Sequence, residues 1–185
     1  MPWIHVIEEE DADEKLKAAY GKIKGARGKV ANILKIHSLK PDTMLAHEEL
    51  YLTLLFRNSG LSREEREIIA TVVSVANKCE YCIQHHAEAL NHYWEDRERI
   101  DRLILDPSTA NLTAREQAIV LYAVKLTQCA SNMQEQDIDA LRQAGFSDED
   151  ILSINLIASY FNFVNRIALG LGVEFSEEEV KGYNY

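Results

Sequence analysis

Residues 77–86 read NKCEYCIQHH, and they include two of the three cysteines of the chain, Cys79 and Cys82. A histidine, His86, follows Cys82 by four positions. Residues three and four positions apart lie on one face of a helix, so a helical segment would place these three side chains in one row. The pKa of a cysteine falls in a Cys-x-x-Cys pair, at a helix N-terminus and beside a cationic histidine. The stretch therefore predicts a redox-active dithiol with its own proton acceptor.

An acidic residue upstream, Glu67, is the expected partner of His86. Glu67 precedes Cys79 by twelve positions, which on one unbroken helix would be a separation of roughly 18 Å. The asparagine and lysine just before Cys79 predict a break, because asparagine tolerates the left-handed conformation that ends helices. If a helix over 62–76 packs antiparallel to a helix over 79–94, Glu67 and His86 lie at similar depth. Glu67 would then orient His86, which would take the proton of the second cysteine.

Helix signals dominate the rest of the chain, and no stretch of useful length alternates as a strand does. Three capping boxes place an apolar residue, then Ser or Thr, then an acid three positions on. Their members are Ser62 and Glu65, Thr113 and Glu116, and Ser147 and Asp150. The expected helices cover residues 11–24, 30–38, 41–56, 62–76, 79–94 and 151–171, with a capped turn at 176–182. The predicted class is all-α.

The length of 185 residues suits one substantial core. We expect a single domain over 1–185, with its signature region at 61–94. Residues 65–70 align with residues 116–121, which indicates a weak repeat at 112–130 of a helical hairpin. Only the first copy carries the cysteine pair.

The composition narrows the classes of function and location. A net charge of -10 argues against nucleic acid as a partner, because phosphate binding needs clustered Lys and Arg. No apolar run approaches the roughly 18 residues of a membrane span, and the N-terminus lacks the regions of a secretory signal. We therefore expect a cytoplasmic protein, where disulfides are usually catalytic or redox-sensing.

The spacing of Glu67, Cys79, Cys82 and His86 resembles the signature of the AhpD-like alkylhydroperoxidases, which belong to the carboxymuconolactone decarboxylase-like superfamily. The residues around the signature are most similar to those of a peroxidase-related branch of these proteins. The similarity extends over about residues 30–173. It includes HSLKP at 37–41, AH at 46–47 and YFNFVNR at 160–166.

The resemblance implies an all-helical fold, a homo-oligomer and peroxide reduction through a thiol–disulfide cycle. It implies that Cys82 attacks the peroxide to give a sulfenic acid and that Cys79 resolves it as a disulfide. Glu67 and His86 would form the proton relay. The implied partners are a hydroperoxide substrate and a thiol reductant protein of lipoyl or thioredoxin type. No cofactor is expected.

One position departs from the family pattern. The best-known members have a histidine just before the second cysteine, where this chain has Tyr81. Either Tyr81 supplies a hydroxyl, or the acid–base set is simpler and the peroxidase activity is low. His85 points about 100° away from His86 on a helix, and we regard it as a candidate supporting residue. The decarboxylase relatives lack the cysteine pair, so lactone decarboxylation is not expected.

Other chemistries of a Cys-x-x-Cys stretch fit less well. A c-type haem site needs histidine directly after the second cysteine, where Ile83 stands. A structural zinc site needs four ligands, and this stretch offers three, so no metal is expected. A thioredoxin-like site needs a βαβ context that a helical chain does not provide. We expect Cys129 to be a small buried hydrophobe. The remaining histidines, which are expected to be packing or surface residues, are His5, His37, His47 and His92.

The sequence leaves open two functions from different classes. The first is a thiol peroxidase that acts on organic hydroperoxides. The second is a non-catalytic redox sensor or interaction module that uses a reversible disulfide between Cys79 and Cys82. Glu67 and His86 favour the enzyme, because a sensor needs a reactive thiol but no positioned proton relay.

Overall fold

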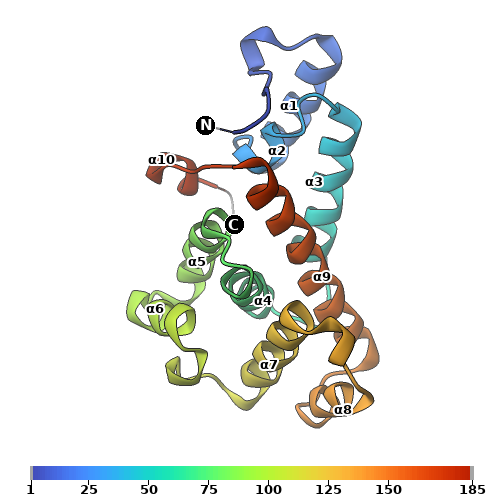
Figure 1. The fold of residues 1–185 in the computed structure, drawn as a ribbon, viewed down its shortest axis with the longest axis vertical. Coiled ribbons are helices and arrows are strands. Elements are labelled where there is room, and N and C mark those ends of the chain that lie inside the picture. Colours follow the sequence, from blue (N-terminus) through green and yellow to red (C-terminus); the bar gives the residue numbers. More distant parts are fainter. Residues whose placement is uncertain (1, 184–185) are drawn as a thin grey trace.

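The computed structural model describes residues 2–183, and this part of the chain is helical, with no strand (Figure 1). The predicted all-α class is therefore confirmed. The α-helices are α1 (Glu14–Arg27), α2 (Asn32–Lys35), α3 (Pro41–Phe56), α4 (Arg63–Ala76), α5 (Glu80–Trp94), α6 (Arg97–Leu105), α7 (Ala114–Gln128), α8 (Glu135–Gln143), α9 (Asp148–Leu171) and α10 (Glu177–Val180). Short 3₁₀ segments lie at η1 (Glu9–Asp11), η2 (Pro107–Thr109) and η3 (Ala130–Asn132).

Helix α4 lies in the middle of the molecule, packed against α5, α7 and α9 (Figure 1). Every side chain from residue 65 to residue 74 is buried. A helix that neighbours cover on all sides must bury its polar residues too, and these need internal partners. Thr71 and Ser74 satisfy their hydroxyls by donating to the carbonyls of Glu67 and Ala70, one turn earlier. The position of α4 thereby places Glu67 in the interior.

The connection between α4 and α5 is short and turns the chain back on itself, as the sequence predicts. The left-handed residue is Lys78, with φ 56°, whereas Asn77 keeps a right-handed conformation as the C-cap of α4. Asn77 is held instead by its side chain, which donates to Asn162 and Asn165 of α9 at 3.0 and 2.9 Å. The break is confirmed, although the expected left-handed asparagine is wrong.

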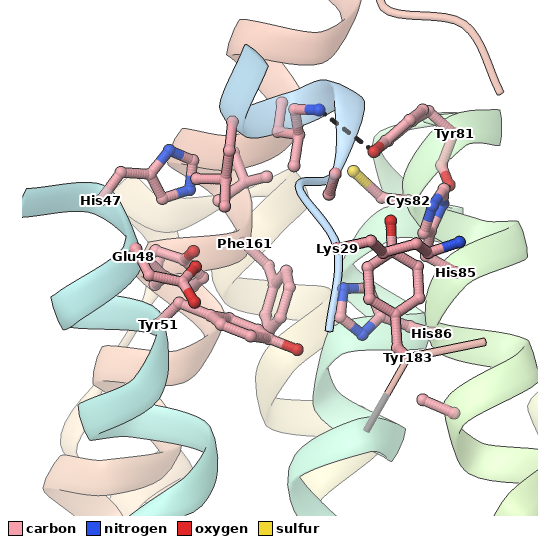
Figure 2. A pocket seen from close by; sticks show the side chains of 16 residues that line it. Lys29, His47, Glu48, Tyr51, Tyr81, Cys82, His85, His86, Phe161 and Tyr183 are labelled. Carbon is pink, nitrogen blue, oxygen red and sulfur yellow. Dashed lines mark hydrogen bonds between the residues drawn. The ribbon is translucent and has the colours of Figure 1, made fainter. Parts of the chain in front are cut away.

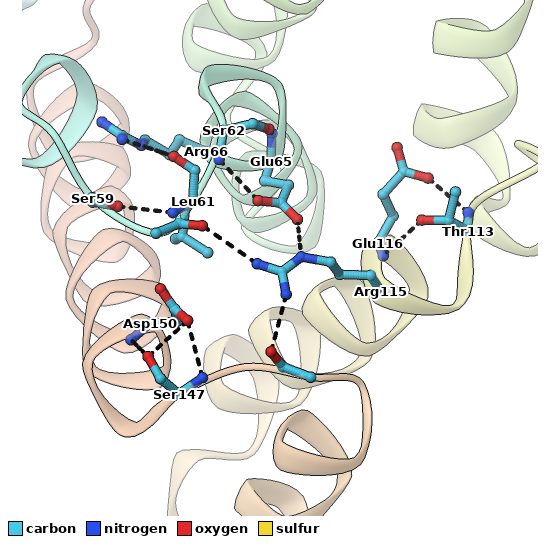
Figure 3. Close-up of polar contacts among 12 residues, drawn as sticks. Ser59, Leu61, Ser62, Glu65, Arg66, Thr113, Arg115, Glu116, Ser147 and Asp150 are labelled. Atoms are coloured by element: carbon cyan, nitrogen blue, oxygen red, sulfur yellow. Dashed lines mark hydrogen bonds and ion pairs between the residues drawn. The ribbon is translucent and has the colours of Figure 1, made fainter.

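The three predicted capping boxes are all present (Figure 3), and arginines link the first two to their surroundings. Glu65, which caps α4, accepts a hydrogen bond from Arg115 of α7 at 2.6 Å. Glu116, which caps α7, pairs with Arg99 of α6 at 3.2 Å. The α7 start thus repeats the α4 start in its capping. Ala118 occupies the place in the repeat that corresponds to Glu67 in the first copy.

Helices α1, α2 and α3 enclose a smaller core beside the main one, built around Leu16, Tyr20 and Met44. Helix α1 runs three residues beyond its predicted end and is capped at Gly28, with φ 84°. Its interior glycines lie on an open surface, where an added Cβ would meet nothing within 4 Å. They lower helix propensity without ending the helix.

Two helices were not predicted, and one cysteine was predicted wrongly. Helices α6 and α8 are rich in charged residues, and each buries only a few apolar side chains. Cys129 is exposed rather than buried, because α7 ends at Gln128 and Cys129 begins the turn into η3. Within residues 2–183, no helix combines the length and the apolar character needed to cross a membrane.

Candidate active site

The two cysteines of the signature stand at the start of α5, and both are buried free thiols. Cys79 is the N-cap residue, and Cys82 lies in the first turn. The hydrogen bond between the thiols lowers the pKa of Cys79, against the effect of burial. The same hydrogen bond, with burial and the charge of Cys79, raises the pKa of Cys82 well above its ordinary value, and a hydrogen bond from Asn165 opposes this. Cys79 is therefore the more acidic thiol, and Cys82 needs a base.

His86 is that candidate base, and it is paired with Glu67 as predicted. Its Nδ1 lies 2.8 Å from Oε2 of Glu67, whose side chain is 0% exposed. A carboxylate beside Nδ1 fixes the proton there and leaves the lone pair on Nε2. The ring packs edge-on against Phe161, with centroids 4.5 Å apart. His86 and Cys82 follow each other by one helical turn on α5, so the imidazole and the thiol share a face.

Arg63 is a further partner of Glu67, and this contact was not predicted from the sequence. Its Nη2 donates to Oε1 of Glu67 at 2.8 Å, and its guanidinium lies over the ring of Phe56 at 3.9 Å. Glu67 therefore has a cationic partner on one oxygen and His86 on the other. The spacing of four residues between Arg63 and Glu67 on a predicted helix is a signal that could have found it.

A buried amide network supports the cysteine side of the site. Asn165 of α9 is fully buried, donates to Ser74 Oγ at 3.1 Å and accepts from Asn77. It is also the residue that bonds to Cys82. Arg166 and Asn162 bond to each other beside this network, with Arg166 Nη1 donating to the Asn162 carbonyl at 2.7 Å. Asn165 therefore links the end of α4 to the thiols.

Tyr81 directs its hydroxyl towards the C-terminal segment. The hydroxyl donates to Glu179 Oε1 at 2.9 Å and accepts from the backbone N–H of Ile33 at 3.1 Å. Burial and the charge of Glu179 raise the pKa of Tyr81 well above its ordinary value. Tyr81 thus stays protonated and fastens α10.

His85 is also fastened to Glu179. Its Nδ1 lies 2.7 Å from the Tyr81 carbonyl oxygen, and its Nε2 lies 2.6 Å from Glu179 Oε2. Although burial works to raise it, the pKa of Glu179 is lowered by the hydrogen bond and charge of His85 and by the bonds from Asn32 and Tyr81. His85 and Glu179 therefore lie in close contact at the edge of the site.

Lys29 holds the same C-terminal segment from the other side. Its ammonium donates to the carbonyl oxygens of Glu178 at 2.9 Å and Glu179 at 2.6 Å, and also to that of Lys181. It lies 4.1 Å from the ring centroid of Tyr183. No sequence spacing could have revealed these contacts, because they join positions about 150 residues apart.

Some of these side chains line a cavity of about 80 Å³ (Figure 2). Helix α5 supplies Cys82, His85 and His86 on one side, and α3 supplies His47 and Glu48 on the other. The remaining lining residues are Lys29, Ala31, Ile33, Leu34, Tyr51, Tyr81, Ala89, Tyr160, Phe161, Val164 and Tyr183. Cys79 does not line the cavity. Among the described residues, no cluster of three His, Cys, Asp or Glu side chains could hold a metal ion.

The chain resembles known proteins both in sequence and in fold. Residues 41–125 match the profile of the carboxymuconolactone decarboxylase family. An uncharacterised peroxidase-related protein from Silicibacter sp. TM1040 is 30% identical, with a TM-score of 0.83 over 97% of this chain and 91% of that one. The chain belongs to the AhpD-like carboxymuconolactone decarboxylase superfamily.

Two further structures show the range of this AhpD-like fold. The AhpD core of a peroxidase-related protein from Ralstonia eutropha JMP134 is 27% identical, with a TM-score of 0.87 over 97% of this chain and 94% of that one. The debrominase Bmp8 is 18% identical, with a TM-score of 0.76 over 95% and 96% of the two chains, which shows the fold alone. A search of curated proteins found no match. Since the fold serves more than one reaction, the chemistry of this AhpD-like protein depends on the residues of its own site.

Proposed function

We propose that the protein is a thiol-dependent peroxidase of the alkylhydroperoxidase type, which reduces organic hydroperoxides through a Cys79/Cys82 cycle. The observation that carries the proposal is the Glu67–His86 pair at 2.8 Å, one helical turn from a cavity-lining thiol. Cys82 is assigned the attack because it faces the cavity, whereas Cys79 does not. Family membership and the peroxidase-related neighbours support the proposal of a peroxidase.

The first step transfers a proton and breaks the peroxide bond. His86 Nε2 takes the proton of Cys82, whose raised pKa makes a base necessary. The thiolate attacks the terminal peroxide oxygen, so that an S–O bond forms as the O–O bond breaks. The alkoxide leaves as an alcohol after taking a proton from the imidazolium. Cys82 is then a sulfenic acid, and the peroxide has accepted two electrons.

The second step closes the disulfide. Cys79, the more acidic thiol, attacks the sulfur of Cys82, the S–O bond breaks, and the hydroxide leaves as water with the proton that the Cys79 thiol gives up. An external dithiol, carried by a lipoyl- or thioredoxin-type protein, restores both thiols by exchange. The raised pKa of Cys82 and the lowered pKa of Cys79 thus suit different roles, since Cys82 reacts with base assistance and Cys79 reacts second.

The alternative function is a redox sensor that uses the same disulfide without turnover. The observation that favours it is the position of Tyr81, which lies between the two cysteines and bonds to Glu179 of α10. A disulfide that moved the first turn of α5 would loosen the C-terminal segment. In this alternative, Glu67 and His86 would have only a structural role.

The assembly is also a proposal. Leu152, Leu156 and Phe163 are exposed apolar residues on α9, and their spacing places them on one face of that helix. We propose that this face is covered in a homo-oligomer. Tyr160 and Phe161 of the same helix are buried beside the cavity and do not belong to this face.

The deciding experiment measures consumption of cumene hydroperoxide under a dithiol reductant by the wild type, Cys82→Ser and Cys79→Ser. We expect Cys82→Ser to lose turnover. We expect Cys79→Ser to perform the first step and accumulate a sulfenic acid on Cys82, which a dimedone probe detects by mass spectrometry. Wild-type turnover no higher than the reductant blank, with ready formation of the disulfide, would instead support the sensor.

A further inference from the structure

The cavity has a second polar side, opposite the reactive thiol, that the proposed chemistry does not use. Helix α3 places His47 and Glu48 there, and both are buried, at 5% and 6% exposure. Figure 2 shows them on the α3 side, across the cavity from Cys82 and His86. Buried polar side chains that line a cavity are the groups that orient a ligand in mostly apolar sites.

A chain of hydrogen bonds fixes the tautomer of His47. Thr43 Oγ1 donates to the Lys40 carbonyl at 2.8 Å, so it must accept from His37 Nδ1, which lies 3.0 Å away. The Nε2 of a neutral His37 is then an acceptor, and His47 Nδ1, 3.1 Å from it, is the donor. His47 Nε2 therefore carries a lone pair.

Both rings are neutral near pH 7, as this chain of bonds requires. Burial lowers the pKa of His37. Burial, together with the nearby His37, lowers the pKa of His47 to about 3. A protonated His47 would place two donors in a buried position beside another imidazole. His47 thus presents an acceptor at neutral pH.

Glu48 adds side-chain oxygens, which are hydrogen-bond acceptors in a carboxylate, to the same wall of the cavity. Aromatic rings surround this side of the cavity. His47 packs edge-on against Tyr160, with centroids 5.6 Å apart, and Tyr51 and Phe161 also line the space. The α3 side therefore combines hydrogen-bond acceptors with apolar faces.

Lys29, the cationic residue that lines the cavity, does not make the cavity suitable for an anionic ligand. Lys29 has three N–H donors, and the carbonyls of Glu178, Glu179 and Lys181 accept from its ammonium. His85 is paired with Glu179. A substrate carboxylate would thus meet His47 and Glu48 without a cation available beside it.

We propose that His47 and Glu48 form a recognition site for a hydrogen-bond donor, a hydroxyl or a protonated amine, carried on a compact apolar body. This inference rests on the proposed function for its orientation, because the reactive end of the same molecule would reach Cys82. The donor group would lie against α3 and the apolar body against Tyr51 and Phe161. Anionic hydroperoxides would be poor substrates.

The binding test does not depend on turnover. Benzyl alcohol, benzylamine and benzoate are titrated separately into the reduced protein, and binding is followed by NMR shifts of α3 amides. We expect benzyl alcohol or benzylamine to bind at least about tenfold more tightly than benzoate, the size of one good hydrogen bond to a polar or charged group. Which of the two binds better identifies the donor as a hydroxyl or an ammonium.

The control variant is a neighbour on the same helix. Glu48→Gln and His47→Phe should each reduce the preference over benzoate at least about threefold. Glu49→Gln, which changes an exposed carboxylate paired with Arg57, should keep it. Equal binding of the three probes, or the same preference in Glu48→Gln as in the wild type, would overturn the site.

Turnover separates this inference from the proposed function. Cumene hydroperoxide is compared with its para-hydroxymethyl, para-aminomethyl and para-carboxyl derivatives, and we expect the difference in KM rather than in kcat. Probe binding that depends on Glu48, without peroxide turnover, would keep the site and reject the peroxidase. Turnover with equal KM for all four peroxides would reject the site and keep the peroxidase.

Discussion

His85 and His86 are adjacent in sequence, and each lies within 2.8 Å of a glutamate oxygen, yet their surroundings differ. The partner of His86 is Glu67, which α4 holds in the core beside Arg63. The partner of His85 is Glu179, which arrives from the short helix α10 near the end of the chain. The His86–Glu67 pair lies in the centre of the fold, and the His85–Glu179 pair joins α10 to the rest of the protein.

The difference lies in how many ring nitrogens are occupied. His86 bonds Glu67 through Nδ1, so its Nε2 remains able to accept a proton. His85 faces the Tyr81 carbonyl with Nδ1 and Glu179 with Nε2, so a protein oxygen lies beside each of its nitrogens. Two histidine–glutamate pairs therefore suit different tasks, proton transfer for His86 and attachment of α10 for His85.

The largest expected effect comes from breaking each pair in turn. Glu67→Gln and His86→Ala should each lower the rate of peroxide consumption by about 10² or more, the usual size of a general acid–base contribution. Glu179→Gln and His85→Ala should lower it less than about fivefold, because neither group accepts the proton of Cys82. Initial rates with cumene hydroperoxide measure this, and melting curves check that each variant folds. Equal losses of rate in the variants of both pairs would show that the two histidine–glutamate pairs do not have different roles.

A second test concerns the thiol that His86 serves. The hydrogen bond and charge of Cys79 are causes of the raised pKa of Cys82. Cys79→Ser removes that charge, so the pKa of Cys82 should fall, while burial still works to raise it. The pH dependence of iodoacetamide alkylation of Cys82 should shift to lower pH than in Cys129→Ser, a control that keeps the pair intact. A shift to higher pH would show that Cys79 does not raise the pKa of Cys82.

The smallest expected effect is a local release of α10 in acid. The pKa of Glu179 is lowered from its ordinary value of 4.5 in the folded protein. Its contribution to stability is therefore fully present above pH 4.5 and is lost as the pH falls through the lower folded value. NMR signals of residues 177–180 should change in that range in the wild type but not in Glu179→Gln. A transition in this segment near neutral pH would point to another group.

Much of the central site could be predicted from sequence, because its parts are close along the chain. The capping box at Ser62, the break before Cys79 and the fixed helical repeat together place Glu67 against His86. Tyr81 was harder to place, since its partner Glu179 is 98 positions away. The hydroxyl donates to Glu179 in this structure, a partner that no local pattern around residue 81 indicates.

The outer parts of the site could not be predicted from local patterns. The roles of Lys29 and Asn165 depend on the packing of distant segments. Helices α6 and α8 carry so many charges that their short apolar stripes were not recognised. The exposed Cys129 shows the opposite error, since an average preference of cysteine for the interior does not describe a residue just after a helix end.

The connection between α4 and α5 also limits how the chain can change length. With only residues 77–79 between Ala76 and Glu80, one inserted residue would turn α5 by about 100° relative to α4. Both helices could persist while His86 left Glu67. The loop after α7 is bridged by the partly exposed pair of Lys125 and Asp137, which is not part of the site, so it should accept an insertion more readily. Natural or engineered insertions are therefore expected to be tolerated around residues 129–134 and to abolish activity at residues 77–79, even where the protein still folds.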